Sequence, residues 1–206
     1  PKYELNGALI DIKSQKSALV GTDTKRLAIA YIANKSEREL SLIVPKKAIM
    51  EIQKLFFDEI EINYDENSLI VTNDNYFFYT RLINGKFPDY ERIIPKSLKY
   101  EIKLPKKEMI DSIKMIAALS SDIKITFEAT KIIFESLSSD NIEAKTSIDY
   151  ETSINNPFTL AVNSKHILDF LTHIDSNSFT IGLNEPNLPF LLKEENFLTI
   201  IMPIIL

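Results

Sequence analysis

Apolar and polar positions along the chain recur in one order: a short apolar run, a stretch with one apolar face, and three further apolar runs. Three segments align without gaps at offsets of 60 and then 58 residues, starting at Leu42, Ile102 and Leu160. In each, apolar residues then recur every three or four positions, which is the period of an amphipathic helix. The predicted helices cover residues 45–57, 105–119 and 163–174.

The start of each predicted helix carries a local signal. Pro45 and Pro105 suit a first helical position, where the missing amide hydrogen removes no intrahelical bond. Asn163 or Ser164 is expected to cap the third helix through its side-chain oxygen.

Strand-like runs follow each helix, and several alternate apolar with polar residues, as in Ile123-Lys-Ile-Thr-Phe127. The nine runs cover residues 60–64, 69–73, 76–83, 123–129, 131–137, 143–150, 179–183, 190–193 and 197–203. Three more, over residues 8–13, 18–22 and 26–32, have no helix in front of them. The pattern therefore predicts about three and a half copies of a β-α-β-β-β unit.

The predicted fold class is α+β, with duplicated β-α-β-β-β units that pair into domains of two helices packed on antiparallel sheets. We expect a first domain over residues 1–95 and a second over 99–206, with a connector over 84–100. The alternative is an α+β protein with accidental internal similarity. The Pro-Lys-Lys sequence repeated at a 60-residue offset, with helix and strands in register, argues against it.

Composition excludes several kinds of site. The 206 residues include no cysteine, which excludes disulfides and zinc–cysteine centres and fits an intracellular, cytoplasmic protein. Only four glycines occur, and no glycine-rich phosphate loop is among them. The longest apolar run, Leu198–Leu206, is shorter than the roughly 20 residues of a membrane span.

Lysine placement modifies the picture given by a net charge of −5. Two aligned positions of the helices are apolar in all three copies and lie seven residues apart, so they share one helix face that should pack on the sheet. They are occupied by Ile49, Met109 and Ile167, and by Phe56, Ile116 and Ile174. The lysines lie about 200° from that side on the helical wheel. The predicted outward, DNA-facing lysines are Lys47, Lys54, Lys107, Lys114 and Lys165. Such a face attracts a DNA backbone weakly and without reading sequence, whereas the alternative is an ordinary solvated helix face.

Motifs along the whole chain resemble one family. Residues 87–95, Phe-Pro-Asp-Tyr-Glu-Arg-Ile-Ile-Pro, are similar to the F-P-D-Y-x-R-v-i-P connector of the bacterial DNA sliding clamp, the β subunit of DNA polymerase III. Leu5-Asn-Gly7 and Thr22-Asp-Thr-Lys-Arg-Leu-Ala28 resemble its L-N-G and T-D-g-h-R-L-A segments. The ending Met202-Pro-Ile-Ile-Leu206 resembles its M-P-m-r-L ending.

The resemblance implies a non-enzymatic processivity factor without cofactor or metal. Clamp-type domains form a ring around duplex DNA, and the ring is a head-to-tail homodimer of three-domain protomers. Polymerase, clamp loader and repair proteins are tethered to it through short peptides of the pattern Q-L-x-L-F. This chain is expected to hold most of the second domain and all of the third, and to be monomeric.

The resemblance also implies a peptide-binding groove between these two domains. The groove residues carried over by position are Leu5, Thr22, Lys25, Arg26, Leu27, Pro88, Arg92, Ile93, Pro189, Ile200, Met202, Pro203 and Ile204. Leu27, Ile93 and Ile200 alternatively belong to the core, and Pro88 and Pro203 alternatively form turns. Thr24-Lys25 replaces the family's usual Gly-His and Ile205 its usual arginine, so we expect a different loop shape and a lost peptide contact.

Two other functions are alternatives to the sliding-clamp interpretation. One is a peptide-binding module with no DNA role. The other is an unrecognised hydrolase, for which His166 and His173 are the candidate residues because they lie seven apart on one helix. No further metal-ligand motif accompanies them, so we expect both on the surface or facing DNA, and Asp89 in a turn rather than acting as a base.

Overall fold

The protein is described here by a computed structural model that places residues 3–137 and 144–206. It divides into two compact units, the first ending at Glu91 and the second beginning at Arg92. The division lies inside the predicted connector over residues 84–100. The start of the predicted strand over residues 143–150, at Glu143, lies outside the described residues.

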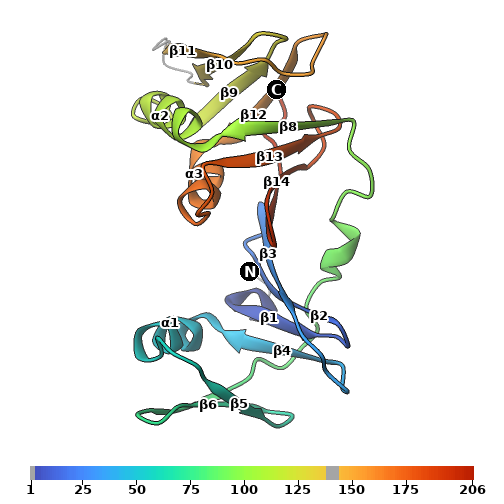
Figure 1. Cartoon of the computed structure of the whole chain (residues 1–206), viewed down its shortest axis with the longest axis vertical. Coiled ribbons are helices and arrows are strands. Elements are labelled where there is room, and N and C mark those ends of the chain that lie inside the picture. Colours follow the sequence, from blue (N-terminus) through green and yellow to red (C-terminus); the bar gives the residue numbers. More distant parts are fainter. Residues whose placement is uncertain (1–2, 138–143) are drawn as a thin grey trace. The chain divides into compact units, whose positions relative to one another are not determined.

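The second unit contains the β-α-β-β-β order twice (Figure 1). The first copy consists of β8 (Tyr100–Pro105), α2 (Lys106–Ala117), β9 (Asp122–Phe127), β10 (Lys131–Ser136) and β11 (Lys145–Asp149). The second consists of β12 (Phe158–Asn163), α3 (Ser164–Thr172), β13 (Ser178–Leu183), β14 (Phe190–Glu194) and β15 (Phe197–Ile201). The predicted duplication and the α+β fold class are confirmed.

The two copies of the second unit exchange their first strands. β8 pairs antiparallel with β13 of the second copy, and β12 pairs antiparallel with β9 of the first copy. The strand orders are therefore β8-β13-β14-β15 in one sheet and β12-β9-β10-β11 in the other. Because each sheet needs a strand from both copies, neither copy completes its sheets alone.

The core of the second unit lies between the two helices and the sheets. Met109 and Ile167 are both 1% exposed, and Ile116 and Ile174 are 1% and 3% exposed. These are the aligned positions that the helical period assigns to the core. Phe170 of α3 packs its ring against Phe179 and stacks on Phe197, with centroids 5.8 and 5.3 Å away.

The first unit follows the same order from its third element, the strand after the first helix, onward. A short 3-10 helix, η1 (Tyr3–Asn6), leads into β1 (Gly7–Ile12), β2 (Lys16–Thr22) and β3 (Arg26–Ala33). Next come β4 (Leu40–Pro45), α1 (Lys46–Leu55), β5 (Glu61–Tyr64), β6 (Ser68–Thr72), β7 (Phe77–Arg81) and a second 3-10 turn, η2 (Tyr90–Arg92). β4 pairs with β1 as β12 pairs with β9, which gives the sheets β4-β1-β2-β3 and β5-β6-β7.

The first unit lacks two of the elements found in the second, as far as residues 3–91 are described. Its one α-helix is α1, and β5 has β6 as its sole sheet neighbour there, whereas the equivalent β13 lies between β14 and β8. Ile62 and Tyr64 on β5 are accordingly 46% and 44% exposed. Two helices per domain, as predicted, are thus present in the second unit.

The helix starts correct one prediction and confirm another. Pro45 and Pro105 precede α1 and α2 as the last strand residues, with extended ψ angles of 139° and 124°, rather than occupying the first helical position. The ring of proline fixes φ but leaves ψ free, so the same residue can end a strand. Asn163 caps α3, and its side chain accepts a hydrogen bond from the Lys165 amide at 3.2 Å.

None of the helices in the described residues is long and apolar enough to cross a membrane.

Gly7 stands at a close approach of two backbones at the start of β1. A Cβ there would lie 2.4 Å from the Val44 carbonyl oxygen on β4 and 3.0 Å from the Ile83 Cδ1 atom. The backbone oxygen belongs to a paired strand and cannot move without breaking the β1–β4 ladder. Glycine is therefore required by packing at this position.

We expect Gly7→Ala to lower the free energy of unfolding by about 2 kcal/mol or more, because the new methyl group overlaps a fixed carbonyl. Gly21→Ala is the matched control, since its Cβ would meet nothing within 4 Å. Urea denaturation measures both variants, and equal stability of the two would contradict the packing argument.

Candidate functional site

The turn between β2 and β3 is built around the Asp23 carboxylate. Its Oδ1 atom accepts hydrogen bonds from the Lys25 and Arg26 amides, both at 3.0 Å, and its Oδ2 atom accepts one from the Arg26 Nε at 3.0 Å. Burial alone would raise the pKa of Asp23, but these bonds and the Arg26 charge together lower it. The turn therefore holds Arg26, one of the predicted groove residues, at both backbone and side chain.

Thr22 closes the same turn from the other side. Its hydroxyl donates to the Arg26 carbonyl at 2.6 Å, and its oxygen accepts from the Thr24 amide at 3.2 Å. Side-chain bonds of this kind replace backbone pairing in tight turns. The predicted groove residues from Thr22 to Arg26 thus form one hydrogen-bonded turn.

Thr24 has a φ of 75°, in the left-handed region that glycine adopts without strain. This is the position where the resembling family usually has glycine. A β-branched residue there brings its Cβ close to the following carbonyl and strains the backbone. The bonds made by Asp23 and Thr22 hold the turn in place despite that strain.

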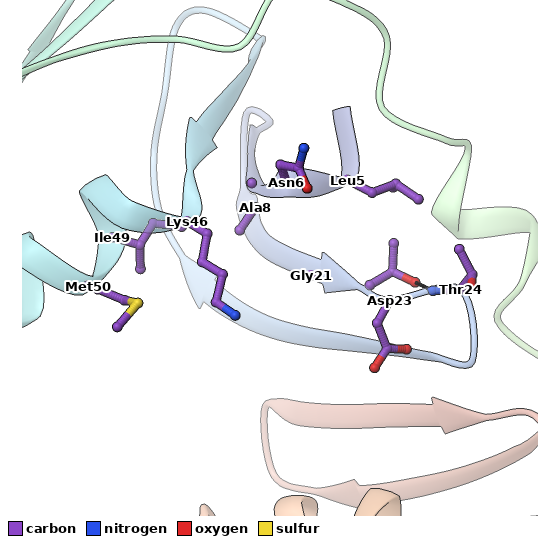
Figure 2. Close-up of a pocket in the computed structure, with 11 residues that line it drawn as sticks. Leu5, Asn6, Ala8, Gly21, Asp23, Thr24, Lys46, Ile49 and Met50 are labelled. Carbon is purple, nitrogen blue, oxygen red and sulfur yellow. Dashed lines mark hydrogen bonds between the residues drawn. The ribbon is translucent and has the colours of Figure 1, made fainter. Parts of the chain in front are cut away.

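A pocket of about 590 Å³ lies beside this turn, within the first unit. Figure 2 shows Lys46, Ile49 and Met50 of α1 on one side of it, and Leu5, Asp23 and Thr24 on the other. The residues that line it are Leu5, Asn6, Gly7, Ala8, Gly21, Thr22, Asp23, Thr24, Lys46, Ile49 and Met50. Of the predicted groove residues, Leu5 and Thr22 are brought together here.

The α1 residues of this pocket were not predicted as site residues. Ile49 was assigned to the core face, and it does pack partly against the cluster that contains Ala48 and Leu69. Met50 is 47% exposed, and a methionine next to an apolar helix position is the one signal that the sequence offers. A helical wheel alone cannot separate a core face from a pocket wall, because both are apolar.

The connector alternates between buried and exposed side chains. Phe87 and Tyr90 are 8% and 6% exposed, whereas Pro88 and Arg92 are exposed and Ile93 is 42% exposed. The predicted groove residues of this segment therefore all reach the surface. Asp89 is exposed as well, in keeping with the turn position expected for it.

The C-terminal segment exposes several large apolar side chains, among them Met202, Ile205 and Leu206. Met202, directly after β15, is 44% exposed, while Pro189, Pro203 and Ile204 are half-buried. The Ile204 amide donates to the Ala161 carbonyl at 2.7 Å and so ties the segment to β12. Ile205, which stands where the resembling family has arginine, is 80% exposed.

Leu27 and Ile200 differ from the other predicted groove residues because they are 3% and 1% exposed. Their burial fits the alternative interpretation of these two residues as core. Substituting either of them would perturb packing, so neither is suited to testing a surface site.

All five predicted outward lysines are exposed. Lys54 pairs with Glu51 at 2.9 Å and Lys165 with Asp169 at 2.8 Å, each on its own helix. Lys47, Lys107 and Lys114 form no ion pair within residues 3–137 and 144–206. Exposed pairs are weak, so all five ammonium groups remain able to contact a phosphate.

The histidines form no metal centre. His173 is exposed, and its Nδ1 atom lies 2.6 Å from the Asp169 carbonyl of its own helix, whereas His166 is half-buried. Across the described part of the chain, no three histidine, cysteine or acidic residues gather in a way that could hold a metal ion.

Comparison with known proteins identifies related chains. The profile described as DNA polymerase III beta subunit, central domain, matches residues 1–89, and that of the C-terminal domain of the same subunit matches residues 91–204. The Beta sliding clamp of Helicobacter pylori is 40% identical over 202 residues, which cover 94% of this chain and 54% of that protein. The Pseudomonas putida Beta sliding clamp is 27% identical over 204 residues, 94% of this chain and 55% of that one.

Solved structures give the same fold. The Helicobacter pylori beta clamp bound to a DNA ligase peptide has a TM-score of 0.93 at 38% identity, over 100% of this chain and 58% of that one. The DNA polymerase III subunit beta of Pseudomonas aeruginosa has a TM-score of 0.94 at 23% identity, over 100% of this chain and 60% of that one, which supports the fold alone. The chain spans about half the length of the curated relatives it matches.

We expect Thr24→Gly to raise the free energy of unfolding by about 0.5–1 kcal/mol, because relief of left-handed strain exceeds the added freedom of the unfolded chain. Lys25→Gly is the control in the same turn, since Lys25 has no positive φ and should lose stability instead. Thermal unfolding followed by circular dichroism compares the two. A loss of stability in both variants would show that Thr24 is not strained.

Proposed function

We propose that this chain, which belongs to the DNA polymerase III beta subunit family, is part of a processivity factor. That factor is a ring-shaped sliding clamp that encircles duplex DNA and tethers polymerase, clamp loader and repair proteins. The observation that carries the proposal is the match, in order, to two successive domains of the family over residues 1–89 and 91–204. The role is non-catalytic, takes place in the cytoplasm and needs no cofactor.

The part of that role we assign to this chain is peptide docking. The exposed apolar side chains of Ile93 and Met202, with the exposed guanidinium of Arg92, have the chemistry that leucine and aromatic anchors of a Q-L-x-L-F peptide require. Methionine adapts its shape to different partner side chains. The related Helicobacter pylori clamp has been solved with a DNA ligase peptide, which supports the same class of partner here.

The residues that we propose for peptide binding come from three stretches of the sequence. Leu5 and the hydrogen-bonded turn with Thr22, Lys25 and Arg26 form the first, and Pro88, Arg92 and Ile93 of the connector form the second. The third, at the C-terminal end, holds Pro189, Met202, Pro203 and Ile204, while the buried Leu27 and Ile200 lie within the first and third stretches. Pre-ordered donors such as the Arg26 segment lower the entropy that a peptide must lose on binding.

DNA contact is the second part of the proposal. The exposed helix lysines offer positive charge to phosphates without any arrangement for reading bases, which suits a protein that must slide. The ring that we propose closes as a head-to-tail homodimer.

A peptide-binding module without a DNA role is the second candidate. It is favoured by the net charge of −5 and by the intrahelical ion pairs of Lys54 and Lys165, which lower the local positive charge. Retention of the full-length protein on circular DNA separates the two, since a module of this kind would dock peptides and yet be lost from the circle.

We expect Met202→Ala to weaken binding of a Q-L-x-L-F peptide to this chain by ~1–3 kcal/mol, because the peptide loses an adaptable apolar anchor. Isothermal calorimetry measures the affinity. Met115→Ala, at a residue that is 61% exposed on α2, is the matched control and should leave the affinity unchanged. No binding to the unsubstituted chain would overturn the docking role.

We expect the double variant Lys107→Gln and Lys114→Gln to weaken binding to a short duplex DNA at low salt. The dependence of log affinity on log salt should become less steep by about 2, as two phosphate contacts are lost. Fluorescence anisotropy follows the titration. Lys103→Gln with Lys193→Gln, two exposed lysines on β8 and β14, is the charge-matched control. Equal effects of the two pairs would favour the module without a DNA role.

A further inference from the structure

A buried carboxylate lies in the sheet of the first unit. Asp11 on β1 is 9% exposed. Its Oδ1 accepts a hydrogen bond from the Ser41 hydroxyl at 2.9 Å, and its Oδ2 accepts one from the Tyr90 hydroxyl at 2.8 Å. Burying a charged group is unfavourable unless its oxygens are satisfied, so both bonds are needed to hold the carboxylate inside.

The two donors come from very different places in the chain. Ser41 is the cross-strand neighbour of Asp11 on β4, so it is set by the sheet register. Tyr90 lies 79 residues further along, in the connector, and is itself 6% exposed. The bond between Asp11 and Tyr90 therefore fixes the connector to the sheet rather than one strand to another.

Ile83, directly before the connector, contacts the same sheet. Ile83 donates its amide to the Ile43 carbonyl at 2.8 Å, and its Cδ1 atom lies where a Cβ on Gly7 would point. Because alternate strand residues share a face, Gly7 and Asp11 point to the same side of β1. Ile83, Phe87 and Tyr90 are all buried, so buried side chains recur along residues 83–90.

A second contact joins the sheet to the residue after Tyr90. The Lys13 ammonium binds the Glu91 carboxylate and lies 3.5 Å from the Asp11 Oδ2. The hydrogen bond to Glu91 is the main reason that the pKa of Lys13 is raised. Burial would raise the pKa of Asp11, but the bonds from Tyr90 and Ser41 and the charge of Lys13 together lower it, so the carboxylate stays ionised.

We infer that Asp11 is a positioning residue of the peptide-binding site. By accepting the hydrogen bond from the Tyr90 hydroxyl, it fixes the short turn η2, whose last residue is Arg92. The inference rests on the proposed docking function. Arg92 is the last residue of the turn that Tyr90 begins, and Ile93 follows it directly. Asp11 itself is not proposed to contact the peptide.

The physical effect is pre-ordering. A turn whose first residue is anchored presents Arg92 and Ile93 in one orientation, so a peptide does not have to order them on binding. Without the Tyr90 bond, the buried carboxylate loses a donor and the turn loses its attachment. The free turn then samples other conformations, and binding weakens although every residue that touches the peptide is intact.

The test compares Tyr90→Phe and Asp11→Asn with Tyr79→Phe in the full 206-residue chain. Tyr79→Phe is the matched control, because it also removes a tyrosine hydroxyl of the first unit, one that lies 3.2 Å from the Ser68 hydroxyl. Peptide affinity is measured by anisotropy with a fluorescent Gln-Leu-Ser-Leu-Phe peptide, at a temperature where every variant is fully folded. Hydrogen exchange of the Arg92 and Ile93 amides is measured on the same samples.

We expect Tyr90→Phe and Asp11→Asn each to weaken the peptide by roughly fivefold and to speed exchange at Arg92 and Ile93 by about tenfold, with Tyr79→Phe unchanged. The double variant should be no weaker than the worse single variant, because both act through one bond. A residue that only supports folding would change the unfolding temperature but not the affinity of the folded chain.

Affinity and exchange in Tyr90→Phe equal to those of Tyr79→Phe would overturn the inference. If the unsubstituted chain binds no peptide, the proposed docking function fails. In that case exchange alone decides about Asp11: unchanged exchange in Tyr90→Phe overturns its positioning of the turn, and faster exchange supports it.

Discussion

The exchange of first strands between duplicated copies is the constraint on which the rest of the structure depends. β8 completes the sheet of β13–β15, and β12 completes the sheet of β9–β11. Since each helix directly follows an exchanged strand, the exchange also brings α2 and α3 together over one core. The same rule operates in the first unit, where β4 joins β1.

The surfaces proposed for function lie on the turn after β2 and on the connector, both of which are held by side-chain contacts. The turn after β2 is closed by side-chain bonds from Asp23 and Thr22, which keep Arg26 in place and hold Thr24 in a strained conformation. The connector is anchored by buried side chains and by the bond from Tyr90 to Asp11. In both places a rigid scaffold orders an exposed segment, which is the general way in which loops acquire binding roles.

The order and type of the elements could be predicted from the sequence because they depend on local periodicity. Apolar spacing identified the core positions Met109, Ile116 and Ile167. A side-chain oxygen before a helix left Asn163 or Ser164 as the cap, and Asn163 is the one that caps α3. Proline chemistry was less decisive. Pro45 and Pro105 fit either the end of a strand or the start of a helix, since their fixed φ suits both and ψ is set by the strand that precedes them.

Properties that depend on distant residues could not be predicted. Nothing near Asp11 in the sequence indicates that its carboxylate is buried, because its donor Tyr90 is far along the chain. Likewise Leu27 and Ile200 belong to apolar motifs like those of Ile93 and Met202, yet the first two are buried and the last two are exposed. Identifying groove residues by motif alone therefore mixes core and surface positions.

The central proposal is that this chain binds a short Q-L-x-L-F peptide through the proposed groove residues. The most direct measurement is a nuclear magnetic resonance titration of the isotope-labelled chain with a Q-L-x-L-F peptide. We expect the chemical shifts of six amides to change and to saturate together with one dissociation constant. These are the amides of Lys25, Arg26, Arg92, Ile93, Met202 and Ile204. Shifts confined to the α1 residues Lys46, Ile49 and Met50, or separate saturation of these amides, would contradict it.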